Sequence, residues 1–145
     1  MLTNQKLLIR PTFNFVRQLS VTAYFHNSSV IQTGKILEAT DADFKKLVLE
    51  SKEPVIVDFY ADWCGPCKLL APILERVVKD NKKVTLVKLN TDNNQELAEK
   101  YSITGLPTVC SFHKGKNFDR FIGVISEGRV REFVEQASAL DDSNK

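Results

Sequence analysis

Apolar residues recur along this chain with two kinds of spacing, one typical of helices and one typical of strands, and these spacings predict its elements. The β-branched run Val55–Tyr60 has the length of a buried strand, and residues 84–89 repeat that pattern. Between these runs, apolar residues recur every three or four positions from Pro66 onward, which predicts a long helix. Pro72 lies inside this helix and is expected to kink it, because proline offers no N–H to the carbonyl of Lys68. The apolar stripe of the helix consists of Cys67, Leu70, Ile73, Leu74, Val77 and Val78.

Shorter segments complete the order of elements. Thr40 is placed to cap a first helix, and residues 96–101 suit a further short one. Strands are predicted over residues 108–112 and 118–122, with Gly115 in the turn between them. Apolar residues at helical spacing mark both the first helix, at Phe44, Leu47 and Val48, and a last helix, at Val130, Phe133, Val134 and Ala137.

Strands that alternate with helices predict an α/β fold, in which helices cover both faces of a central sheet. The last two strands are separated by a short turn and should form an antiparallel hairpin, so the sheet is expected to be mixed. With 145 residues, of which 43% are hydrophobic, the chain has room for one ordinary domain. We place this domain at residues 31–140 and a polar C-terminal tail at residues 141–145.

The N-terminal 30 residues differ in charge from the rest of the chain. The whole chain has a net charge of only +2, which does not suggest a nucleic-acid surface. No apolar run approaches the ~20 residues that cross a bilayer, so no membrane partner is expected. Residues 1–30 contain Lys6, Arg10 and Arg17 but no acid, and RQLS at residues 17–20 resembles a mitochondrial processing site. This composition predicts a transit peptide and a location in the mitochondrial matrix. The alternative is a disordered N-terminus on a cytoplasmic protein.

Two cysteines stand where the first long strand gives way to the long helix. Cys64 falls at the N-terminus of that helix, where the helix dipole and free N–H groups favour a thiolate, the form that attacks disulfides. Cys67 lies one turn later and begins the apolar stripe, so we expect it to be the more buried thiol. Pro66 fits a first helical turn and Gly65 allows close backbone approach, while Trp63 offers an apolar face. The pattern predicts Cys64 as the nucleophile and Cys67 as the resolving thiol.

A single carboxylate interrupts the apolar strand before the cysteines. Side chains alternate along a strand, so Asp58 shares a face with Ile56 and Tyr60 and is buried if that face is covered. Burial without a partner would raise the pKa of Asp58 and make it a candidate proton acceptor for Cys67. Lys88, on the second strand, could lie near it. The alternative is that Asp58 lies at a strand end in solvent.

These residues together resemble the thioredoxin family over residues 33–140. The matching motifs occur in the same order and spacing as in that family: VDFYADWCGPCK, which ends at Lys68, the helix proline Pro72, VKLNTD around Lys88, GLPT at residues 105–108, and Gly123. With its basic head, the chain looks like a mitochondrial member of the family. The resemblance implies a thioredoxin fold and protein-disulfide reductase activity. It implies no bound cofactor, because electrons from NADPH arrive through thioredoxin reductase. The implied clients are disulfide-containing proteins such as peroxiredoxins or methionine sulfoxide reductases.

The resemblance also implies roles for individual residues. Asp58 and Lys88 would form a buried pair that handles the proton, and the Leu106–Pro107 peptide bond would be cis. A flat apolar patch would dock clients; its residues would be Trp63, Gly65, Pro66, Leu106, Pro107 and Gly123. Gly65 and Pro66 between the cysteines favour a reducing couple, with a reduction potential of about −270 mV rather than the value of about −120 mV for a strong oxidant.

The cysteines are also compatible with other functions. Cys64 and Cys67 together with Cys110 and His113 give a ligand count that suits zinc. The strand pattern argues against a shared ion, because residues 110 and 113 point to opposite faces of one strand. Cys110 is expected to be a small buried core residue, and His113 a surface residue like His26. A non-catalytic binding or assembly module that uses the same apolar patch is the alternative function, and an oxidase or isomerase is a further redox alternative.

Overall fold

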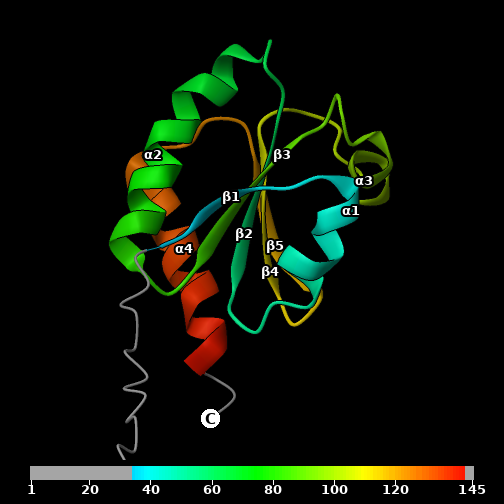
Figure 1. Ribbon diagram of the computed structural model, residues 1–145. Helices are drawn as coiled ribbons and strands as arrows, with labels where there is room; N and C mark the ends of the chain where they lie inside the picture. The colour runs from blue at the N-terminus through cyan, green and yellow to red at the C-terminus, as the bar shows by residue number, and fades with distance from the viewer. Residues whose placement is uncertain (1–33, 143–145) are drawn as a thin grey trace, which may run out of the picture.

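The computed structural model describes residues 34–142, in which one sheet lies between two layers of helices (Figure 1). The elements in chain order are β1 (Ile36–Glu38), α1 (Asp41–Phe44), the π-helical segment η1 (Lys45–Leu49), β2 (Val55–Tyr60), α2 (Gly65–Asn81), β3 (Thr85–Asn90), α3 (Gln95–Lys100), β4 (Thr108–His113), β5 (Lys116–Ile122) and α4 (Glu127–Asp142). The α/β fold and its predicted order of elements are confirmed. The short strand β1 is not predicted from the sequence, because three residues are too few to establish an alternating pattern.

The sheet is mixed, with strand order β1-β3-β2-β4-β5. Strands β1, β3 and β2 are parallel, whereas β4 runs antiparallel to both β2 and β5. The antiparallel hairpin therefore lies at one end of a parallel core, as predicted. Because β2 and β3 are parallel neighbours, their carboxyl ends lie at the same edge, where the loops after Tyr60 and Asn90 meet.

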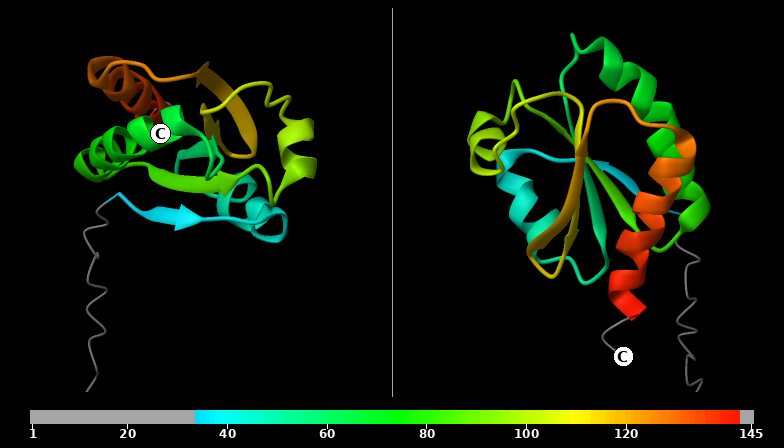
Figure 2. Two further views of the ribbon diagram at one scale, coloured as in Figure 1. Left: turned by 90° about the horizontal axis from the view of Figure 1, so that it is seen from above. Right: turned by 180° about the vertical axis from the view of Figure 1, so that it is seen from behind.

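Helices α2 and α4 cover one face of the sheet, and α1, η1 and α3 cover the other (Figure 2). Alternation along β2 divides its side chains between the two faces. Ile56 packs into a core with Leu70 and Leu74 of α2. Val57 and Phe59 pack into the other core, beneath α1 and α3. Asp58 has the parity of Ile56 and so faces the α2 side.

The β4–β5 hairpin is tighter than the sequence predicts. Strand β4 ends at His113 and β5 begins at Lys116, which leaves Lys114 and Gly115 as a two-residue turn with φ of 48° and 78°. Positive φ at both positions is the geometry that twisted hairpins require. The predicted surface position of His113 is wrong, because the residue ends a buried strand and is only 2% exposed. Its ring lies 6.3 Å from the ring of Phe118.

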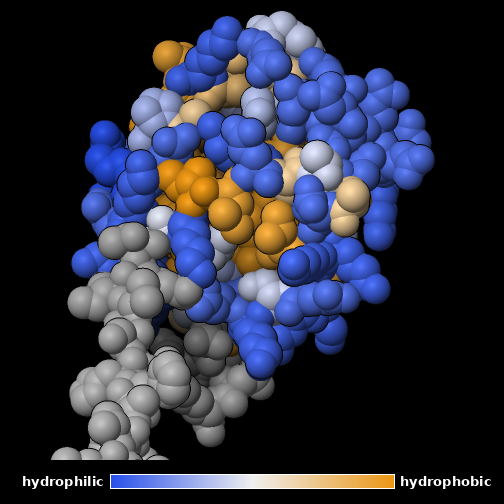
Figure 3. All heavy atoms as spheres, in the orientation of Figure 1, coloured by the Kyte–Doolittle hydropathy of each residue, from blue (hydrophilic) through white to orange (hydrophobic). Residues whose placement is uncertain are grey.

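Strand β1 forms one edge of the sheet and is only partly covered. Its residues Ile36 and Leu37 are half-buried against the two cores. Figure 3 shows an apolar patch framed by hydrophilic side chains in this region. Within residues 34–142 no helix is long and apolar enough to cross a membrane. The predicted transit peptide, His26 and residues 143–145 of the predicted tail lie outside the described part of the chain.

Candidate active site

The loop between β2 and α2 brings the two cysteines together. Cys64 caps α2, and Cys64 and Cys67 form a disulfide with their Cα atoms 5.3 Å apart. The backbone N–H of Cys67 donates a hydrogen bond to Sγ of Cys64 over 3.2 Å. Pro66 occupies the first turn, where no N–H is needed. The Cys64 sulfur therefore lies at the positive end of a 17-residue helix, where negative charge is favoured.

The two cysteines are equally buried, at 3% and 4% exposure, so the expectation that Cys67 is the more buried thiol is wrong. Ala61 and the half-buried Leu106 pack against both. The asymmetry between the cysteines lies instead in the space that each one lines. Cys64 lines an open groove of about 530 Å³ at the surface. Cys67 lines a separate cavity of about 130 Å³ that Asp58 also lines.

The groove beside Cys64 gathers four of the six predicted docking residues. They are Trp63, Gly65, Pro66 and Leu106. The indole of Trp63 is 72% exposed and donates a hydrogen bond from Nε1 to Asp92 over 2.9 Å. This bond fixes one edge of a large apolar side chain that is open to a partner. Asp92 was not found by sequence reasoning, although it follows β3 at the edge where the cysteine loop lies.

The remaining two docking residues, Pro107 and Gly123, are not among the residues that line the groove. The Leu106–Pro107 peptide bond is cis, as the resemblance implies, and Pro107 is buried. The N–H of Gly123 donates a hydrogen bond to the carbonyl of Pro107 over 2.8 Å. The groove is also lined by residues that the sequence did not predict. They are Thr91 after β3, Ala98 of α3, and Ile103, Thr104 and Gly105 in the loop that follows α3.

Asp58 is buried beside the cysteines, which rules out the alternative position in solvent. Its exposure is 2%, and its Oδ1 accepts no hydrogen bond. Burial raises the pKa of Asp58 from its ordinary 3.8 to about 6; the charge of Lys88 opposes this rise, and that of Glu75 adds to it. A carboxyl group with this pKa, in the cavity that Cys67 lines, can take up or release a proton near neutral pH.

Lys88 lies opposite Asp58 in the β2–β3 register, but its ammonium group pairs elsewhere. Its Nζ lies 3.2 Å from Oε1 of Glu75 and 5.5 Å from the centre of the Tyr60 ring. Burial lowers the pKa of Lys88, but the hydrogen bond and charge of Glu75, together with the charges of Asp58 and Tyr60, outweigh it, so the pKa lies above its ordinary value. The pair implied by the resemblance is therefore a cluster of three charged groups, and Lys88 is partly exposed rather than buried.

Cys110 is separate from this site. It is fully buried in the core beneath α1 and α3, as expected for a small core residue. Burial raises the pKa of its thiol, although contacts with Asn117 and Arg120 oppose the rise. The four residues of the zinc alternative do not converge, since Cys64 and Cys67 belong to a different cluster. No group of three or more potential ligands within residues 34–142 is placed to hold a metal ion.

Comparison with known proteins gives a consistent result. The family model described as Thioredoxin matches residues 35–136. A thioredoxin of Buchnera aphidicola is 43% identical over 103 residues, which are 70% of this chain and 94% of that protein. The Probable thioredoxin-2 of Caenorhabditis elegans is 36% identical and covers 90% of this chain and 88% of its own length. The crystal structure of the thioredoxin Mala s 13 from Malassezia sympodialis has a TM-score of 0.67 at 27% identity, over 79% of this chain and 100% of that one.

Proposed function

We propose that this chain, which belongs to the thioredoxin family, reduces disulfides in client proteins by a two-step exchange at Cys64 and Cys67. Thioredoxins are thiol–disulfide oxidoreductases, and this chain is such an enzyme. One observation carries the assignment of roles. The cysteine pair caps a long helix between a surface groove on the Cys64 side and a cavity with a buried carboxyl group on the Cys67 side.

The first step is the attack of reduced Cys64 on a client disulfide. The Cys64 thiolate forms a bond to one client sulfur, and the other client sulfur leaves with the electron pair of the broken bond. The helix N-terminus stabilises the thiolate, and the groove gives the client access to it. The apolar docking surface for this encounter consists of Trp63, Gly65, Pro66 and Leu106 in the groove, together with Pro107 and the Gly123 that is hydrogen-bonded to it.

The second step releases the client. Cys67 attacks Cys64 in the mixed disulfide, the Cys64–Cys67 bond forms, and the client departs with both of its sulfurs reduced. Cys67 must lose its proton to attack, and Asp58 is the acceptor within the same cavity. The proton passes directly or through a water molecule, and Lys88 tunes the basicity of Asp58 through its charge.

Electrons reach the oxidised chain from NADPH through a thioredoxin reductase, and the chain binds no cofactor of its own. The test is NADPH consumption with a thioredoxin reductase and insulin as the client, for the full chain and its Cys67→Ser variant. We expect sustained turnover for the wild type and a loss of at least 100-fold for the variant, because without the resolving thiol the client is not released. A folded wild type without activity would favour the alternative of a binding module, whose partner contacts would survive loss of both cysteines.

The basic, acid-free head supports a proposal about location. Residues 1–30 act as a transit peptide, and the domain that starts at residue 31 works in the mitochondrial matrix. Peroxiredoxins and methionine sulfoxide reductases are the proposed clients there. A fluorescent protein fused after residue 30 should enter mitochondria, and one that stays in the cytoplasm would contradict the proposal.

A further inference from the structure

Asp58 and Lys88 line the cavity that Cys67 also lines, and a third charged side chain, Glu75, contacts Lys88. Asp58 of β2 and Lys88 of β3 lie opposite each other in the parallel register. Glu75 of α2 completes the group through its contact with Lys88. Along α2, Cys67, Ala71 and Glu75 follow one another at intervals of four residues and therefore lie on one side of the helix. One side of α2 thus joins the resolving cysteine to the lysine that faces the buried carboxyl group.

The two carboxylates share the lysine unequally. The Lys88 Nζ lies 3.2 Å from Glu75 Oε1, and the two side chains are 21% and 30% exposed. Asp58 is far more buried, and its Oδ1 accepts no hydrogen bond. A buried carboxylate has more to gain from an ammonium partner than an exposed one has. The ion pair with Glu75 therefore holds the Lys88 ammonium group away from Asp58, although Asp58 is the more buried carboxylate.

We propose that Glu75 is a positioning residue for the resolving step: its ion pair holds the Lys88 ammonium group and so leaves Asp58 free to accept the Cys67 proton. This inference rests on the proposed function and deepens it. In the step itself, the Cys67 sulfur bonds to the Cys64 sulfur and the client sulfur leaves with the bonding pair. The Cys67 proton passes to Asp58, and over the two steps the dithiol loses the two electrons that the client disulfide gains.

Several other charged or titratable groups surround the cavity that Asp58 lines. Opposite Asp58 on β4 lies the apolar Val109, so no charge approaches from that strand. The groups that remain near the cavity are Tyr60, Asp62, Cys67, Lys68, Glu75 and Lys88. Glu38 of β1 also lies opposite Lys88 in the register, and its charge acts on Tyr60. The charge of Lys88 lowers the pKa of Asp58 and that of Glu75 raises it. Loss of Glu75 would remove the second effect and strengthen the first, because Lys88 could then approach Asp58.

The test compares titrations of Asp58 in the oxidised full chain, followed by the NMR signal of its carboxyl carbon. In the Glu75→Gln variant we expect the midpoint to fall by about half a pH unit or more. Asp80→Asn is the matched control: it removes one negative charge from the same helix, at a residue that faces Arg131 rather than Lys88. Its midpoint should stay at the wild-type value. An unchanged midpoint in Glu75→Gln, or an equal fall in Asp80→Asn, would overturn the proposal.

A double-mutant cycle shows whether Glu75 acts through Lys88. Lys88→Gln alone should raise the Asp58 midpoint, because it removes an attractive charge. In that background, Glu75→Gln should lower the midpoint by less than half as much as it does in the wild type. An equal fall in both backgrounds would mean that Glu75 acts on Asp58 directly, and it would refute the positioning role. Circular dichroism spectra confirm that each variant is folded.

The kinetic readout is the pH profile of client release from a preformed mixed disulfide in a single turnover. Glu75→Gln should move this profile to lower pH by the same interval as the Asp58 midpoint, and Glu75→Asp should restore part of the difference. A profile that does not move while the midpoint does would contradict the link to the resolving step. The titration needs no activity, so an inactive wild type would refute the proposed function without deciding the role of Glu75.

Discussion

At the scale of single residues, Asp58 is the group that links the resolving cysteine to proton transfer. The sequence shows a carboxylate in an apolar strand, and strand alternation correctly predicts the face on which it lies. Burial itself depends on α2 packing over that face, which is a property of the whole fold. Glu75 could not be predicted as its neighbour, because on α2 it reads as an ordinary charged residue between apolar positions. Only the packing of α2 against β3 shows that it meets Lys88.

Substitution of Asp58 should make stability depend less on pH. The pKa of Asp58 is raised in the folded state to about 6 from an ordinary 3.8, so its contribution to stability is fully present below about pH 4. It is lost as pH rises through 6, where the folded state must hold a buried charge. Asp58→Asn should therefore gain about 3 kcal/mol in free energy of unfolding, relative to wild type, between pH 4 and pH 8. Urea unfolding of the oxidised proteins across this range measures the gain, and a difference that is constant with pH would contradict the account.

At the scale of elements, sequence periodicity identifies the long helices and the central strands but misses the edge. Strand β1 spans three residues and depends on pairing with β3 for its existence. Gly34, the first residue that the structure describes, constrains the position of β1. Gly34 is buried, and a Cβ at this residue would overlap the carbonyl oxygen of Val78 in α2. The backbone at Gly34 approaches α2 so closely that only glycine fits, and this contact determines where the chain enters the sheet.

Gly34→Ala should destabilise the protein by about 1–3 kcal/mol, because backbone atoms must move to admit the methyl group. Gly128→Ala is the matched control. A Cβ at Gly128, in the first turn of α4, meets nothing within 4 Å, and alanine favours a helix more than glycine does. The control should be neutral or slightly stabilising in urea unfolding. Equal effects of the two substitutions would show that the contact with Val78 does not constrain the chain.

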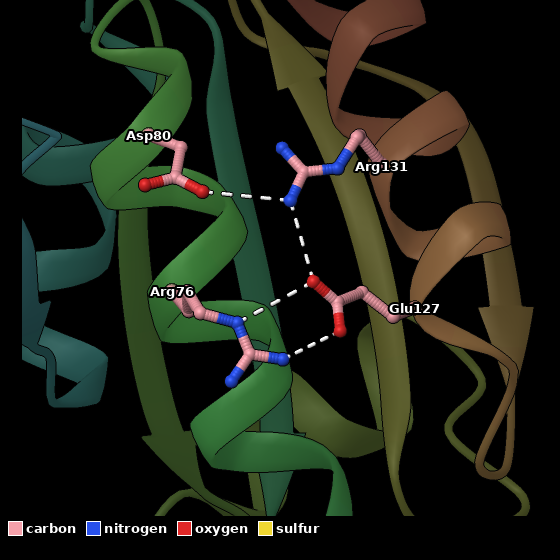
Figure 4. Close-up of polar contacts among 4 residues, drawn as sticks. All are labelled: Arg76, Asp80, Glu127 and Arg131. Carbon is pink, nitrogen blue, oxygen red and sulfur yellow. Dashed lines mark hydrogen bonds and ion pairs between the residues drawn. The ribbon is translucent and has the colours of Figure 1, made fainter.

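At the scale of the whole molecule, α2, which carries the cysteine pair at its N-terminus, packs side by side with α4. Two kinds of contact join them. Apolar side chains pack beneath the helices, among them Leu74 and Val134, which are fully buried. Above them, Arg76 and Asp80 of α2 form ion pairs with Glu127 and Arg131 of α4 (Figure 4). All four charged side chains are at least 42% exposed, so water and salt screen their attraction.

The apolar contacts should therefore dominate the stability of this layer. Leu74→Ala is expected to lower the free energy of unfolding by roughly 3 kcal/mol, because it leaves a cavity in the core. Glu127→Gln removes an exposed charge that pairs with both arginines, and its effect should be much smaller. That small effect should shrink further in 1 M salt. A loss for Glu127→Gln that equals the loss for Leu74→Ala would assign the helix pair to electrostatics instead.

The positions of the helices, of four strands and of the cysteines follow from local sequence patterns, because each rests on residues close together in the chain. The strand order β1-β3-β2-β4-β5 could not be predicted in this way, because it depends on pairing between distant segments. The same holds for the part of the groove that α3 lines and for the Glu75–Lys88 pair, because they arise where distant segments pack. The proposed chemistry begins at a single atom, the sulfur of Cys64, which attacks the client disulfide.

The most direct test is mass spectrometry of the adduct that the reduced full-length Cys67→Ser variant forms with insulin. We predict a mixed disulfide between Cys64 and one insulin chain, and no adduct for Cys64→Ser under the same conditions. An adduct through Cys110, or one that forms equally well without Cys64, would contradict the account.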